Sequence, residues 1–201
     1  MKKTFHDFLN KFIPLSVEEY EQLIVPCVIT RNFGKKEIIT HAGQVEEYMN
    51  FIDNGLVRKY YKKENDEINT QISHEGHIIH AQESFHSRTP SEYIVEAIEP
   101  CELTSITYEC LERIYSSSEK MQQLGRLVIT ATMVLKDRWQ SQLVKLTPRE
   151  RFLNFVSRHP ELMQRVPQKY LASYLNIKPE TFSRFKHMVK EYSKKVLFHQ
   201  N

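Results

Sequence analysis

The sequence predicts an α+β protein built from a β-roll, one long helix and a C-terminal helix-turn-helix. Between residues 27 and 107, short segments rich in β-branched and aromatic residues alternate with turn residues, as in a sandwich or roll. An apolar stripe with helical spacing covers residues 118–144, and residues 166–190 contain two short amphipathic helices. The predicted domains are a β-roll at 1–115, a long helix and hinge at 116–146, and a helix-turn-helix domain at 147–201.

Two short helices are predicted ahead of the roll. The first has an apolar face formed by Phe5, Phe8, Leu9 and Phe12. Ser16 and Glu19 have the spacing of a capping box, so a second helix should begin there, run to about Val25 and end before Pro26.

Eight strands are predicted in the roll. They are CVITRNF, EIITH, YMNFID, GLVRKYYKK, INTQISH, HIIHA, YIVEAIE and CELTSIT, in chain order. Asn54-Gly55 and Asn65-Asp66 are predicted hairpin turns, because these residues tolerate the backbone angles that such turns need.

The long helix is predicted to pair with a second copy of the chain. About 25 helical residues extend about 37 Å, which is longer than a small domain needs. Its apolar residues step by three and four, as in a coiled-coil seam. The expected dimer contacts are Leu124, Val128, Ala131, Leu135 and Trp139. The alternative is that the stripe packs on the roll, and we expect part of it to do so.

The C-terminal domain begins with a strong helix start, in which Thr147 and Glu150 form a capping box around Pro148. The helix-turn-helix follows, and its two apolar faces enclose a turn. They consist of Leu171, Ala172 and Leu175, then Phe182, Phe185, Met188 and Val189. The last residues, EYSKKVLFHQN, could supply one short strand but hardly a complete wing.

The charge distribution points to nucleic acid as the partner of this domain. Residues 145–201 contain 12 Lys/Arg and 4 Asp/Glu, a balance of +8, whereas residues 1–144 contain 16 and 21, a balance of −5. A basic module on an acidic body is the electrostatic footprint of a DNA-binding protein.

Other classes of function find little support in the sequence. No apolar run is long enough to span a membrane, and the N-terminus lacks the apolar centre of a signal peptide, so we expect a cytoplasmic protein. Three cysteines without a CxxC pair fit a reducing compartment and structural thiols. The known phosphate-cradling glycine loops and hydrolase motifs are missing, which argues against an enzyme.

The order of these parts resembles the Crp/Fnr family of bacterial transcription regulators, most closely its Bacteroidetes branch. FIDNGLVRKYY is similar to a strand pair of the family's cyclic nucleotide-binding-like roll. The stretch from Leu146 to Phe185 is similar to its winged-helix-like DNA-binding domain. The resemblance covers nearly the whole chain. It implies a homodimer that binds an inverted repeat of double-stranded DNA, with RNA polymerase as a further partner.

The resemblance also assigns DNA contacts to individual residues. Glu180 can accept from a cytosine amine and Arg184 can donate to guanine, because both lie in the family's recognition-helix pattern. The full predicted set is Gln168, Lys169, Glu180, Thr181, Ser183, Arg184, Lys186 and His187. Lys178 replaces the usual hydroxyl cap and Pro179 replaces a base-contacting arginine of several members, so the half-site need not match theirs.

A cyclic nucleotide is not expected as the effector. Aligning the roll with family members that bind one places His80 and Ala81 at their Gly-Glu pair, and Ser91 and Glu92 at their Arg-Ser pair. The arginine that would hold the phosphate is therefore absent, and serine cannot replace its bidentate fork. No cofactor is identified and the effector stays open.

The sequence also leaves room for two other kinds of function. A metal site could be imagined among His74, His77, His80 and His86, but strand spacing of three places neighbouring members on opposite faces, so no metal is expected. The second is a β-roll ligand-binding or protein-interaction module whose helix-turn-helix no longer reads DNA. It is the main alternative to a sequence-specific regulator.

Overall fold

The computed structural model describes residues 4–198, with side chains up to residue 188. The chain forms two compact units, Met1–Leu135 and Lys136–Asn201. The long helix α5 (Glu119–Lys145) contributes to both, since the division falls between Leu135 and Lys136. Within the described part, no helix combines the length and hydropathy that a membrane span requires.

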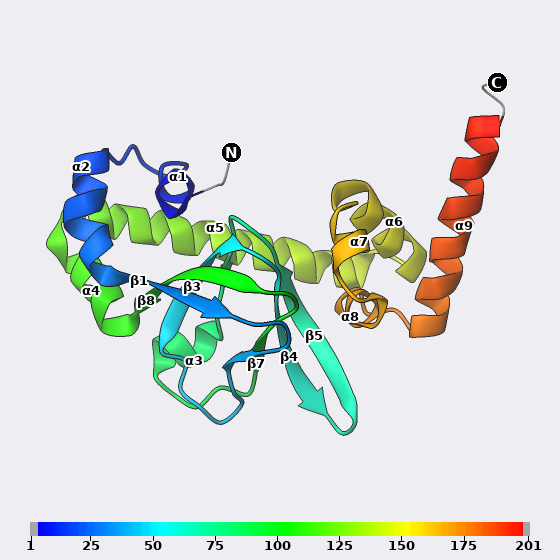
Figure 1. The fold of residues 1–201 in the computed structure, drawn as a ribbon, viewed down its shortest axis with the longest axis horizontal. Coiled ribbons are helices and arrows are strands. Elements are labelled where there is room, and N and C mark those ends of the chain that lie inside the picture. The colour runs from blue at the N-terminus through cyan, green and yellow to red at the C-terminus, as the bar shows by residue number, and fades with distance from the viewer. Residues whose placement is uncertain (1–3, 199–201) are drawn as a thin grey trace. The chain divides into compact units, whose positions relative to one another are not determined.

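The first unit contains a β-roll of two four-stranded antiparallel sheets (Figure 1). One sheet has the order β1 (Val28–Phe33), β8 (Cys101–Thr107), β3 (Tyr48–Asn54) and β6 (Ile78–Ile79). The other has the order β2 (Ile38–Thr40), β7 (Ile94–Ala97), β4 (Val57–Lys63) and β5 (Asp66–Ser73). Ile52, Val57, Val95 and Leu103 are fully buried in one core cluster, so the two sheets share an interior. Each strand overlaps a segment where the sequence predicted one, although β5 begins two residues earlier than predicted, at Asp66.

Of the two predicted hairpins, one is confirmed, with its turn one residue earlier than the predicted Asn65-Asp66, and one is wrong. Strands β4 and β5 pair directly through a turn at Glu64 and Asn65, and Glu64 takes a φ of 56°. Asn54-Gly55 instead carries the chain from one sheet to the other, because β3 and β4 do not pair. Gly55 has a φ of 101°, and a Cβ there would lie 2.6 Å from the carbonyl oxygen of Pro100. Glycine is needed for this close approach as well as for its backbone angle.

Short helices and the first half of α5 form a second core with one sheet. The helices that contribute are α1 (Phe5–Leu9), the π-helical η1 (Tyr20–Ile24), the 3₁₀ turn η2 (Val25–Cys27), α3 (Gln82–Ser87) and α4 (Tyr108–Ser117). The short helix α2 (Val17–Glu19), which precedes η1, contributes no buried residue. The capping box at Ser16 and Glu19 is confirmed. The segment after it is helical as predicted, but it widens to a π-helix at Tyr20 and tightens to a 3₁₀ turn at Val25. Its predicted end before Pro26 is wrong, because the 3₁₀ turn continues through Pro26 to Cys27.

The second unit is helical. It holds the end of α5, then α6 (Pro148–Arg158), α7 (Leu162–Arg165), α8 (Gln168–Tyr174) and α9 (Pro179–Phe198). The Thr147 capping box is confirmed. The short strand expected after residue 190 is wrong up to residue 198, because α9 continues through this segment.

Candidate functional site

The helix-turn-helix is closed by a Schellman turn between α8 and α9. The N–H of Asn176 donates to the Ser173 carbonyl at 3.0 Å, and the N–H of Ile177 donates to the Ala172 carbonyl at 2.9 Å. Asn176 has the positive φ, 52°, that this motif requires, and asparagine tolerates it better than most residues. Ala172 and Ile177 are both buried, which supplies the apolar contact of the motif. The turn therefore fixes the direction in which α9 leaves α8.

A buried arginine joins this turn to the end of the long helix. Arg151, on α6, is 7% exposed and donates from Nε to the Leu175 carbonyl at 2.8 Å. Its Nη2 donates to the Asn176 carbonyl at 2.9 Å. Its Nη1 donates to the carbonyls of Leu143 and Leu146 at 3.1 and 2.7 Å. The guanidinium thus satisfies carbonyls that two helix ends leave without an intrahelical partner.

Aromatic packing holds α9 and α5 in the same unit. Phe182 is fully buried and its ring lies edge-on to Phe152 at 5.1 Å. Trp139 of α5 stacks on Tyr174 of α8, with ring centroids 4.2 Å apart and planes 5° from parallel. The last turns of α5 are therefore part of the helix-turn-helix unit.

The predicted DNA contacts lie on the outer side of this framework. Glu180, Arg184 and His187 are exposed, while Thr181, Ser183 and Lys186 are half-buried along the same turns of α9. Lys169 is exposed and Gln168 half-buried at the start of α8. Basic, acidic and hydroxyl groups are thus presented on one helix that Phe182 anchors from the opposite side. Their role in DNA binding stays a prediction.

The predicted dimer residues divide into two groups. Leu124 is 4% exposed within the roll's core, Val128 packs against that core, and Trp139 stacks on Tyr174. These three side chains find partners within their own chain. Ala131 is half-buried, whereas Leu135 is 60% exposed beside the exposed Met133 and Val134. Of the five predicted dimer residues, Leu135 alone is exposed, and its role in a dimer stays a prediction.

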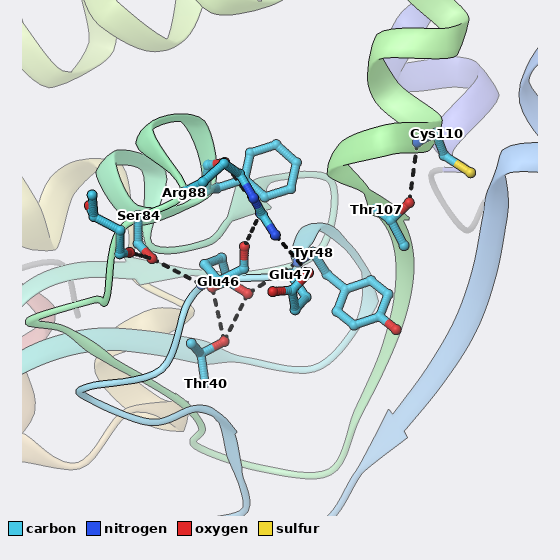
Figure 2. A network of polar contacts seen from close by, with 10 residues as sticks. Thr40, Glu46, Glu47, Tyr48, Ser84, Arg88, Thr107 and Cys110 are labelled. Carbon is cyan, nitrogen blue, oxygen red and sulfur yellow. Dashed lines mark hydrogen bonds and ion pairs between the residues drawn. The ribbon is translucent and has the colours of Figure 1, made fainter.

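A buried glutamate lies against Ala81, in the segment that aligns with the phosphate-binding segment of cyclic nucleotide-binding proteins. Glu46 is 1% exposed, and one carboxylate oxygen accepts from the Ala81 N–H at 3.0 Å. Both oxygens accept from the Thr40 hydroxyl at 2.9 Å, and one accepts from the Tyr48 N–H at 3.3 Å (Figure 2). Burial raises the pKa of the Glu46 carboxyl, and these hydrogen bonds oppose the shift. The N–H of Ala81, at the start of α3, is therefore already paired with a side chain of the roll.

Arg88, which contacts this glutamate, is also engaged. Arg88, in the left-handed conformation after α3, donates from Nη1 to the Glu46 carbonyl and from Nη2 to the Glu47 carboxylate, both at 2.8 Å (Figure 2). Ser91 hydrogen-bonds with the backbone of Tyr93 and Gln44, and Glu92 is exposed. The polar groups named here, between residues 81 and 93, are thus already paired with side chains or backbone of the roll itself. Sequence reasoning missed Glu46 and Arg88. Neither belongs to a motif, and each is hydrogen-bonded to a residue that is distant in the sequence.

An apolar cavity of about 50 Å³ lies elsewhere in the first unit. His80 and His86 line it together with side chains of α1, α4 and α5, whereas Ala81, Ser91 and Glu92 do not. Burial lowers the pKa of His86. The four predicted pocket residues therefore do not share one cavity.

The histidine cluster differs from its prediction in one respect. The rings of His74 and His77 lie 4.3 Å apart, because the two residues sit on the turn between β5 and β6 and not on one strand. Gly76, with a φ of 83°, lets the chain reverse between them.

Comparison with known proteins fits this architecture. Residues 30–118 match the family model of the cyclic nucleotide-binding domain. The search of curated proteins gave no match.

Solved structures match over most of the chain. FixK2 from Bradyrhizobium japonicum is 18% identical, with a TM-score of 0.67 over 83% of this chain and 86% of that one. CLP from Xanthomonas campestris, described as a c-di-GMP-responsive global regulator, is 19% identical, with a TM-score of 0.65 over 88% and 93%. A protein from Eubacterium rectale, described as a transcriptional regulator of the Crp/Fnr family, is 16% identical, with a TM-score of 0.64 over 89% and 85%.

The chain therefore has the fold of the Crp/Fnr transcription regulators. It consists of a roll of the cyclic nucleotide-binding type, a long helix and a helix-turn-helix unit. The resemblance predicted from the sequence is confirmed at the level of the fold.

Proposed function

We propose that this chain is a homodimeric, non-enzymatic transcription regulator of the cytoplasm that reads a specific DNA sequence. The observation that carries the proposal is the helix-turn-helix, in which a Schellman turn and Arg151 hold α9 while Glu180 and Arg184 stay exposed. Glu180 suits a cytosine amine and Arg184 suits guanine. The surrounding +8 balance of residues 145–201 supplies attraction to phosphate.

The dimer in this proposal forms along the exposed apolar surface of α5. Leu135 is 60% exposed at the centre of that surface, and the half-buried Ala131 lies one turn before it on the same side of the helix. Burying it against the same surface of a second copy removes apolar area from water. A two-fold dimer then offers two recognition helices to one face of DNA, so its site is an inverted repeat with half-sites about 34 Å apart. RNA polymerase is the further partner that a regulator of this kind would contact.

The effector of the roll, in this proposal, is not cyclic AMP or cyclic GMP. Two observations support this: Glu46 accepts the Ala81 N–H, and Arg88 is paired with Glu47. A phosphate placed there would have to displace a buried carboxylate or bear its negative charge nearby. Any effector acts by binding two arrangements of the protein with different affinities, because only such a difference shifts their populations.

Selection from a random duplex library tests the DNA proposal. The full-length chain, without added ligand and at moderate salt, should recover a two-fold-symmetric site. The Arg184→Ala variant should lose preference at one base pair per half-site. Arg158→Ala removes the same charge from an exposed position on α6 and serves as the matched control, which should keep the wild-type site.

Recovery of an asymmetric or random pool would contradict the proposal as stated. Repeating the selection with cell extract then separates a regulator that needs its effector from a module whose helix-turn-helix does not read DNA. Titration with cyclic AMP, followed by calorimetry, tests the sensory part separately. Saturable binding would overturn our assignment of Glu46 and Arg88.

A further inference from the structure

The three cysteines of the chain occupy two different settings. Cys27 and Cys110 lie far apart in sequence, yet η2 and α4, the elements that carry them, pack against each other, and both side chains belong to one core cluster. Cys101 instead donates to the carbonyls of Leu56 and Glu99, at 3.2 and 3.0 Å. The fold therefore places Cys27 and Cys110 on two elements that pack together, whereas Cys101 is hydrogen-bonded to backbone carbonyls.

Cys110 is the more accessible member of the pair. It is half-buried on the first turn of α4, where its N–H donates to the hydroxyl of the capping residue Thr107 at 3.2 Å (Figure 2). Arg113, one turn further along α4, donates from Nη2 to Cys110 Sγ at 3.8 Å. A guanidinium and the N-terminus of a helix are the surroundings in which reactive cysteines are found.

Cys27 has the opposite character. It is 7% exposed at the end of η2, immediately before β1, and η2 packs against α4 (Figure 1). Burial raises the pKa of Cys27, so this side chain stays a thiol at neutral pH. An accessible sulfur beside a cation and a buried thiol on the neighbouring element match the arrangement of an attacking and a resolving cysteine.

We propose that Cys27 and Cys110 form a peroxide-oxidisable dithiol, which closes to an intramolecular disulfide. In the first step, the Cys110 thiolate attacks hydrogen peroxide, giving a sulfenic acid on Cys110 and releasing hydroxide. In the second, the Cys27 sulfur attacks the sulfenic sulfur, and a disulfide forms as water leaves. Two thiols are oxidised and one peroxide is reduced to two waters, with protons balanced through the solvent.

The cross-link would act on the route into the long helix. It ties the residue before β1 to the first turn of α4, and α4 ends one residue before α5 begins. Oxidation would therefore restrict how α4 moves against the roll. The inference goes beyond the proposed function, because it concerns the covalent state of the first unit whether or not α9 reads DNA.

Peptide mapping of the oxidised protein is the test. The reduced full-length chain is treated with a small excess of hydrogen peroxide, denatured in an alkylating reagent, digested without reductant and examined by mass spectrometry. We expect two of the three thiols to be lost. The expected peptides are one in which Cys27 is linked to Cys110 and one in which Cys101 is alkylated. A dithiol reductant should restore all three thiols.

Three variants sharpen the result. Cys101→Ala is the matched control and should still form the cross-link. Cys27→Ala leaves the attacking residue without its partner, so a 1,3-dione reagent should capture a sulfenic acid at Cys110. Cys110→Ser should leave Cys27 reduced under the same treatment, and circular dichroism checks that each variant is folded. Retention of all three thiols, a disulfide that includes Cys101, or a disulfide formed only between two chains would overturn the proposal.

Discussion

Arg151 should be the side chain on which the rigidity of the helix-turn-helix depends most. Replacing it with methionine keeps an unbranched side chain of similar length but removes the donors to four carbonyls, those of Leu143, Leu146, Leu175 and Asn176. Two of these carbonyls belong to the helix-turn-helix turn and two to the end of α5. The Arg151→Met variant should therefore loosen both attachments without changing the exposed face of α9.

The loss of stability expected in Arg151→Met follows from how deeply each of the four hydrogen bonds is buried. A hydrogen bond from a charged donor contributes about 1.5–3 kcal/mol, and the bond to Leu175 is the fully buried one. We assign it about 2 kcal/mol. The other three carbonyls are partly buried, so water can replace much of what they lose, and we assign them about 1 kcal/mol together. The expected loss of local stability is about 3 kcal/mol, equivalent to roughly 100-fold in an equilibrium constant.

Native-state hydrogen exchange of the full-length chain measures this loss directly. Amides of α8 and the turn after it should exchange about 100-fold faster in Arg151→Met if they exchange through local opening. Arg149→Met, an exposed position on the same helix, should change these rates by less than about threefold. If Arg151→Met exchanges at the wild-type rate, water or a neighbouring donor satisfies the four carbonyls, and Arg151 does not anchor the turn.

Three other predictions concern the DNA face, the dimer and the roll. Arg184→Ala should cost about 1–3 kcal/mol of discrimination at one base pair per half-site. Lys186→Ala should instead weaken binding to all sequences alike and reduce the salt dependence of binding. Electrophoretic or fluorescence titrations at several salt concentrations compare the two variants. Leu135→Asp should give monomers in sedimentation, because it places a charge on the exposed apolar surface of α5, and a dimer that survives would move the interface elsewhere. In the roll, burial raises the pKa of Glu46 above its usual value near 4.5, so the folded state disfavours the charged form. The stability that Glu46 contributes should therefore fall as pH rises from that usual value through the raised one. Urea unfolding of the wild type and of the non-titrating Glu46→Gln variant at a series of pH values measures this change, and the wild type should lose stability relative to the variant over this pH window. If the difference between their free energies of unfolding stays constant or changes in the opposite sense, the Glu46 pKa is not raised.

The sequence alone determined the features that depend on neighbouring residues. The eight strands followed from β-branched segments between turn residues, and α5, α8 and the start of α9 followed from apolar spacings of three and four. The capping boxes at Ser16 and Thr147 were correctly predicted, because each bond joins residues three apart. The Asn54-Gly55 hairpin was wrong for a related reason. A turn signal shows that the chain bends, but it does not show which strand will be the partner.

Only the tertiary structure decided which distant groups meet. Glu46 reaches Ala81 across 35 positions, and Arg151 reaches Leu175 across 24. Cys27 and Cys110 lie in one core cluster only because η2 packs against α4. The stripe on α5 was visible in the sequence, but burial assigned Leu124 to the roll and left Leu135 exposed. The spacing of apolar residues shows that one face of a helix is apolar. Which element covers that face depends on packing between segments that are distant in the sequence, so local sequence cannot show it.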